Sequence, residues 1–214
     1  MKKSYLVIIV SVLAFVFTGC GPYNNMVNQD ETVKNAWNNV ESQYQRRADL
    51  IPNLVSTVKA EANFEQTTLE NVINARASAT QVKVDAENLT PEAVQQYQNA
   101  QGQLSTALGR LLAVAENYPT LRANDAFRNL QTQLEGTENR ITVARNDFNK
   151  AVQNYNSYVR QFPNNLLAGM FGFKTKEGFK ADAGTQNAPT VDFGTPSAAT
   201  PSATVPRAAD TSGI

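Results

Sequence analysis

Residues 124–162 read NDAFRNLQTQLEGTENRITVARNDFNKAVQNYNSYVRQF, and this stretch decides the fold. Its apolar side chains recur every three or four residues, which is the spacing of one face of an α-helix. They are Phe127, Leu130, Leu134, Ile141, Ala144, Phe148, Ala151, Tyr155, Tyr158 and Phe162. A repeat of about 3.5 residues predicts a narrow seam of the coiled-coil kind. Asn124 is placed to cap the first turn of this helix.

The sequence before this stretch follows the same spacing. Thr90 and Pro91 supply a cap and a first-turn proline for a helix that ends near Tyr118. Between residue 24 and Pro91 the helical pattern is interrupted by Pro52, which lacks an N–H and either starts a new helix or kinks a long one. We therefore predict an all-α, up-and-down antiparallel bundle over residues 24–162. It has four long helices if Pro52 breaks the first, the version we favour, or three if Pro52 kinks it.

The composition excludes several classes of chemistry. The chain has no histidine, which removes Ser-His-Asp triads and histidine-containing zinc sites. Its single cysteine allows no intrachain disulfide and no cysteine-rich metal site. The 19 basic and 19 acidic residues balance, without a basic cluster large enough to neutralise many phosphates. We expect no enzyme activity, no cofactor, no metal and no nucleic-acid partner.

The N-terminal region has the features of a secretory leader. Basic residues 2–3 precede an apolar run over residues 5–17, which is shorter than the roughly 20 residues of a membrane-spanning helix. Thr18 and Gly19 then precede Cys20, an arrangement that resembles the bacterial lipobox, with Phe17 where leucine is usual. We predict a signal peptide over residues 1–19 and a lipid-anchor region over 20–23. The alternative is an uncleaved signal anchor with an inert Cys20.

A lipid on Cys20 would decide the location of the protein. Two or more acyl chains, such as palmitate, hold a protein stably at a membrane, whereas one chain holds it only marginally. We expect a lipoprotein of the cell envelope on the periplasmic or extracytoplasmic side. Gly21 follows the cysteine in place of an aspartate retention signal, which favours the outer membrane if the organism is Gram-negative.

The C-terminal quarter of the sequence divides into two segments. Residues 163–180 contain glycine and phenylalanine, and Phe171, Phe173 and Phe179 can pack on the bundle. Residues 181–214 are rich in Ala, Thr, Ser and Pro and carry few large apolar side chains. Such a segment cannot bury enough apolar surface to offset the entropy of ordering it, so we predict a disordered tail.

Arg47 is the least expected residue of the predicted helices because it falls on the apolar stripe of Tyr44 and Ile51. A buried arginine needs a partner, and Glu138 is a candidate. We predict a structural polar cluster, whose members are Arg46, Arg47, Glu138 and Arg140. Alternatively, Arg47 reaches solvent along its aliphatic stem, or it receives the carboxylate of a ligand.

Several short strings together resemble the LemA family. They are RRADLIPNLV (46–55), NARA (74–77), YPTLR (118–122), ENRI (138–141), AR (144–145), YN (155–156), FP (162–163) and GF (172–173). The resemblance covers roughly residues 23–180. It implies a membrane-attached helical bundle exposed to the cell envelope, without catalytic residues to transfer. Many members are held by an N-terminal spanning helix, whereas this chain has a lipobox-like motif.

Two functional hypotheses follow. The first is a non-catalytic, membrane-anchored envelope module that serves as a scaffold for an unknown envelope protein, docking through a helical face. The second is binding or transfer of a small molecule or lipid within the bundle, which would require an apolar cavity. We expect that cavity among Trp37, Leu104, Leu108 and Phe148.

Overall fold

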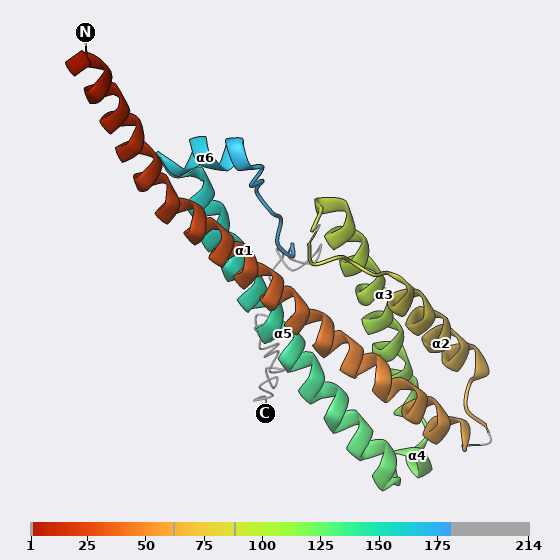
Figure 1. The fold of residues 1–214 in the computed structure, drawn as a ribbon. Coiled ribbons are helices and arrows are strands. Elements are labelled where there is room, and N and C mark those ends of the chain that lie inside the picture. The colour runs from red at the N-terminus through yellow and green to blue at the C-terminus, as the bar shows by residue number, and fades with distance from the viewer. Residues whose placement is uncertain (1, 62, 88, 181–214) are drawn as a thin grey trace, which may run out of the picture. The chain divides into compact units, whose positions relative to one another are not determined.

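The computed structural model describes residues 2–61, 63–87 and 89–180, with side chains from Gly21 onward. This part of the chain is helical and contains no strand. Its helices are α1 (Lys2–Lys59), α2 (Gln66–Gln81), α3 (Pro91–Ala115), α4 (Pro119–Ala123), α5 (Asp125–Arg160) and α6 (Asn164–Phe171). Successive long helices run in opposite directions, which confirms the predicted all-α antiparallel bundle (Figure 1). The predicted tail over 181–214 and the side chain of Cys20 lie outside what is described.

The break that we predicted at Pro52 is wrong, because α1 continues through Pro52 to Lys59. Pro52 is exposed, while Ile51 and Leu54 on either side are buried, so the apolar face stays in register across it. The fourth long helix arises from a later turn. Between Val58 and Leu69 the apolar spacing lapses, and the chain reverses there between α1 and α2.

The predicted helix starts at α3 and α5 are confirmed. The Thr90 hydroxyl accepts a hydrogen bond from the Ala93 N–H at 3.2 Å, ahead of Pro91 in the first turn. The Asn124 side chain accepts from the N–H groups of Ala126 and Phe127, at 2.8 and 3.3 Å. Both caps satisfy backbone donors that have no partner within a helix.

The seam of α5 departs from the predicted repeat in its last third. Val152 and Val159 are buried there, whereas Tyr158 is half-buried, and Phe162 lies beyond the helix and is 81% exposed. A straight α-helix has 3.6 residues per turn and drifts by ~20° per heptad relative to a repeat of 3.5. The buried face therefore moves by one residue, and the predicted place of Phe162 in the seam is wrong.

Two core clusters lie along the α1–α5 pair. The proximal core, nearer the N-terminal end of α1, is rich in aromatic side chains and includes Trp37, Tyr97, Phe148, Tyr155 and Phe179. The distal core is mainly aliphatic and is formed around Leu54, Val72, Leu104 and Leu111. α2 and α3 form a hairpin beside the distal part of this pair, and α6 packs on α1 and α5 (Figure 1). The proximal core therefore needs another cover.

In the described part of the chain, no helix combines the length and the apolar character needed to span a bilayer.

Candidate functional site

A buried polar layer links all four long helices. Arg47 of α1 is 2% exposed, and its Nη1 donates to Ser105 Oγ at 2.6 Å and to Glu138 Oε2 at 3.0 Å. Its Nη2 donates to the side-chain and backbone oxygens of Gln101, at 2.8 and 3.2 Å. Gln101 Nε2 donates to the backbone oxygen of Ala79 in α2, at 3.3 Å. We call Arg47, Gln101, Ser105 and Glu138 the polar layer.

The chemistry of the polar layer is that of a structural cluster. A buried charge is costly unless hydrogen bonds satisfy it, and Arg47 has four of them. Its guanidinium also lies 5.0 Å from the centre of the Tyr44 ring. Of the three guanidinium nitrogens of Arg47, Nε has no hydrogen-bond partner. Because the donors of Arg47 are directed at fixed oxygens on α3 and α5, the layer fixes how those helices slide relative to α1.

The structure brings together two of the four residues that we predicted for this cluster. Arg47 and Glu138 are in contact, whereas Arg46 and Arg140 are exposed and make no described contact with the layer. Each residue turns a helix by about 100°, so Arg46 points away from the face of Arg47, and Arg140 away from that of Glu138. The sequence analysis missed Gln101 and Ser105. Gln101 occupies an apolar position between Tyr97 and Leu104. A polar residue at such a position could have indicated a buried partner for Arg47.

A second arginine explains how α1 tolerates Pro52. In a helix the carbonyl of residue 48 accepts the N–H of residue 52, which proline lacks. Arg76 of α2 supplies the missing donor, because its Nε lies 2.8 Å from the Ala48 oxygen. Arg76 is half-buried, and Ala48 is 3% exposed. Arg76 therefore has a structural role between α1 and α2.

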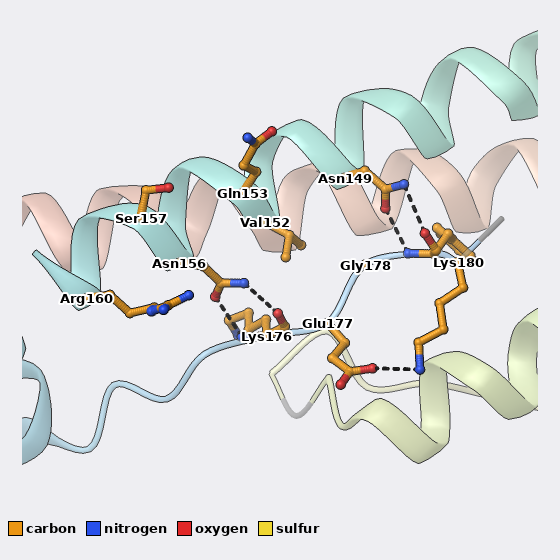
Figure 2. A pocket seen from close by; sticks show the side chains of 11 residues that line it. Asn149, Val152, Gln153, Asn156, Ser157, Arg160, Lys176, Glu177, Gly178 and Lys180 are labelled. Atoms are coloured by element: carbon orange, nitrogen blue, oxygen red, sulfur yellow. Dashed lines mark hydrogen bonds and ion pairs between the residues drawn. The ribbon is translucent and has the colours of Figure 1, made fainter.

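The extended segment 173–180, which we call the strap, covers the proximal core. Three side-chain amides each hold both the N–H and the C=O of one strap residue. Asn156 binds Lys176 in this way at 2.7 and 2.9 Å, and Asn149 binds Phe179 at 2.8 and 3.2 Å (Figure 2). Gln98 of α3 binds Lys180 at 2.9 and 3.3 Å. These contacts replace the backbone pairing that a neighbouring strand would supply.

Two strap side chains anchor it. The Phe179 ring is buried in the proximal core, stacked at 5.8 Å on Trp37 and edge-on to Phe148 at 5.5 Å, and the Arg145 guanidinium lies 4.9 Å from its centre. Lys176 Nζ lies 3.0 Å from the Asp30 carboxylate of α1. The expected packing of Phe179 is thus seen, while Phe173 is half-buried and Phe171 is 56% exposed.

Burial changes the acidity of two tyrosines in this half of the bundle. The Tyr155 hydroxyl donates to the Lys174 oxygen of the strap at 2.9 Å, and burial, with the charge of Asp30, raises the pKa of Tyr155 to about 12. Burial also raises the pKa of Tyr97 well above its usual range, because its anion would lose the solvation it has in water. Both hydroxyls are held neutral, so neither is poised as a proton donor or acceptor near neutral pH.

An open hollow of about 480 Å³ lies between α5 and the strap, and Asn149, Gln153, Ser157 and Arg160 contribute polar groups to it (Figure 2). Gly178 forms part of its wall. A Cβ there would stand 2.5 Å from Asn149 Oδ1, so only glycine leaves room for the Asn149 clamp. In the described residues, no group of three or more carboxylate or thiol side chains is arranged to hold a metal ion.

The cavity that we predicted within the bundle is not formed by the residues we named. Trp37 and Phe148 belong to the proximal core, whereas Leu104 and Leu108 belong to the distal core. Arg47 and its partners lie between Tyr44 in one core and Ile51 in the other along α1. The four residues cannot line one space, because the polar layer divides the interior at this level.

Large apolar side chains are exposed at the N-terminal end of the bundle. Phe162, Leu166, Met170 and Phe171 are 81%, 61%, 78% and 56% exposed, respectively. We call these four residues the apolar foot. Tyr23 of α1 lies beside them, with its ring 4.9 Å from that of Phe171. The apolar foot thus consists of the turn after α5 and the outer side of α6.

Fold and interior together define an antiparallel helical-bundle protein with a buried arginine layer and a C-terminal strap. The model of the LemA family matches residues 36–193, and the chain belongs to that family. The match includes the whole polar layer and the strap.

Three relatives show how far the likeness extends. The chain is 30% identical over 191 residues to the magnetosome protein MamQ 2 of Paramagnetospirillum magneticum, covering 80% of this chain and 70% of the relative. It is 28% identical over 190 residues to MamQ of Magnetospirillum gryphiswaldense, covering 80% and 69%. It is 22% identical over 163 residues to protein LemA of Metamycoplasma hominis, covering 76% and 71%.

Proposed function

We propose that this protein is a non-catalytic scaffold of the cell envelope, anchored to a membrane by lipid on Cys20 after residues 1–19 are removed. The observation that carries the proposal is the continuity of α1, which runs from the Cys20 position into the bundle without a flexible linker. An anchor at that residue would hold the body close to the membrane surface. The magnetosome relatives support a role at a defined cellular structure.

The organisation of the body favours binding over catalysis. Its buried charge, Arg47, is satisfied by structural partners, and the raised pKa values of Tyr97 and Tyr155 keep both hydroxyls neutral. The long helices leave wide faces open to a partner, on which Ile73 of α2 and Val143 of α5 are exposed apolar residues. A protein partner would dock on such faces through residues spaced along a helix. On this proposal the body faces the periplasmic or extracytoplasmic side.

Mass spectrometry of the mature protein tests the anchor. We expect a chain that begins at Cys20 and carries the added mass of two or three acyl chains, and a Cys20→Ala variant that lacks this mass. A retained leader with a bare Cys20 thiol would contradict the proposed anchor.

Photo-crosslinking in intact cells tests the scaffold role. A crosslinker at Val143, which is 60% exposed, should give a discrete protein adduct. The adduct should be lost in Cys20→Ala, because the partner is expected at the membrane. A crosslinker at the exposed polar position Glu135, which lies about 80° around the same helix from Val143, is the matched control. No adduct from Val143 or Ile73 in lipidated protein would contradict a scaffold function.

A further inference from the structure

Three of the four large apolar residues of the short helix α6 lie on its outer side, while Leu167 packs against the proximal core. Asn164 and Ala168 are the buried residues of this helix, whereas Leu166, Met170 and Phe171 are largely exposed. A helix that packs on a protein body normally turns its large apolar side chains inward. Phe162, which is 81% exposed, precedes α6 in the turn between α5 and α6. Several large apolar side chains exposed within one short segment mark a contact with another apolar phase.

The apolar foot lies beside the N-terminal end of the described side chains. The ring of Tyr23 is 4.9 Å from that of Phe171 and 5.8 Å from that of Phe173. Tyr23 follows Cys20 by three residues on the same helix, which is a rise of roughly 4.5 Å. A membrane that holds Cys20 therefore lies within about one helical turn of the foot.

The charges next to the foot suit a membrane surface. Residues 160–176 contain three basic residues, Arg160, Lys174 and Lys176, and no acidic residue, and Lys176 is paired with Asp30 of α1. Arg160 and Lys174 are exposed. Exposed apolar side chains flanked by basic ones are typical of helices that lie in the headgroup region and are attracted to anionic lipids.

We propose that the apolar foot is a second membrane contact, with α6 lying in the interface of the bilayer that carries the N-terminal anchor. Phe162, Leu166, Met170 and Phe171 enter that interface, while Asn164 and Ala168 keep α6 attached to α1 and α5. The inference rests on the proposed anchoring, because the anchor places the foot at the membrane. Two contacts, the anchor and the foot, then restrict how the bundle tilts.

Fluorescence quenching by brominated lipid tests this contact in the full mature protein. The single Trp37 is buried, so a second tryptophan introduced by Met170→Trp reports on the foot. The purified lipidated protein is reconstituted into vesicles of phosphatidylethanolamine and phosphatidylglycerol, with or without bromine near the top of the acyl chains. Val143→Trp is the matched control, because Val143 is 60% exposed on α5 and does not belong to the foot. Thermal unfolding and near-UV circular dichroism verify that both variants are folded.

We expect brominated vesicles to quench the added emission of Met170→Trp and to leave that of Val143→Trp unchanged. An interfacial helix buries its apolar face by roughly 5–10 Å, within reach of the bromines. A second variant, Leu166→Asp with Met170→Trp, should lose most of the quenching.

Flotation with the vesicles separates failure of the foot from failure of the anchor. Protein that floats with the vesicles but shows equal emission at position 170 with and without bromine overturns the foot and leaves the anchor intact. Protein that does not float overturns the anchor and, with it, the foot. Concentration-dependent self-association that shields position 170 from bromine also overturns the proposal, because a second copy would then cover the foot.

Discussion

The two halves of the bundle solve the same packing problem by different means. The distal core is closed by the hairpin of α2 and α3, with aliphatic side chains in the ordinary helical pattern. The proximal core is closed partly by residues 84–87 and 89–97, before and at the start of α3, and partly by the strap, whose backbone is bound by Asn149, Asn156 and Gln98 and whose Phe179 fills the aromatic cluster. The polar layer lies between them. A helical bundle can thus replace a missing helix with an extended segment if the backbone N–H and C=O groups of that segment are hydrogen-bonded.

The largest effect is expected where the two halves meet. Arg47→Ala truncates a fully buried side chain and leaves the oxygens of Gln101 and Ser105 without their donor, while the half-exposed Glu138 can be solvated, so we expect the free energy of unfolding to fall by about 3–5 kcal/mol. Urea denaturation measures the change. Arg47→Met should fold and lose less stability than Arg47→Ala, since the methionine side chain fills much of the space that the arginine side chain occupied.

Arg46→Ala is the control for that experiment. Arg46 is exposed, and surface substitutions usually change stability by less than about 0.5 kcal/mol. An equal decrease in the free energy of unfolding for Arg46→Ala and Arg47→Ala would contradict the role of the polar layer in fixing the helix register. So would an unchanged melting curve for Arg47→Met.

The second-largest effect is expected when the Phe179 ring, which holds the strap on the proximal core, is removed. Phe179→Ala deletes a buried ring from the proximal core, a change that costs about 3 kcal/mol or more. Hydrogen exchange should show lost protection at the amides of Lys176 and Phe179, with the amides of α2 unaffected. Phe171→Ala removes an exposed ring, so in solution it should leave both the stability and the protection of the strap amides unchanged. Loss of protection in α2 as well would show that the halves unfold together.

Alkaline pH should weaken the proximal half. The raised pKa of Tyr155, about 12 against 10 in the unfolded chain, gives a stabilisation that is complete below pH 10 and is lost as pH rises toward 12. Tyr97 acts in the same direction. For Tyr155 the loss is on the order of 2 kcal/mol. Urea titrations followed by Trp37 fluorescence should show that the free energy of unfolding falls less steeply with rising pH in Tyr155→Phe than in the unaltered protein. An identical fall in the two proteins would contradict the assignment of this pH dependence to Tyr155.

The smallest effect concerns the Pro52 site next to the distal half. Arg76→Ala leaves the Ala48 oxygen without its donor, at a cost of about 1–2 kcal/mol. In Pro52→Ala the restored N–H at position 52 can bind that oxygen, so Arg76→Ala should then cost clearly less. A double-mutant cycle measures this coupling. Additive effects would show that Arg76 acts elsewhere.

The sequence predicted the long helices because their apolar spacing is regular and their caps are local. It identified Arg47 because a charge interrupted an apolar stripe. It did not predict the passage of α1 through Pro52, because the compensating donor, Arg76, comes from another helix. It also missed the clamps on the strap. Asn149 and Asn156 stand at polar positions of α5, and they bind backbone atoms, which carry no sequence signature.

The continuity of α1 also sets a lever arm. Gly21 and Lys59 lie on one helix, which separates them by roughly 60 Å at 1.5 Å per residue. No hinge intervenes, so a rotation imposed at the N-terminal end is transmitted to the turn between α1 and α2. A small rocking at the base would sweep that turn through a wide arc, and any partner bound at the far tip would be carried with it.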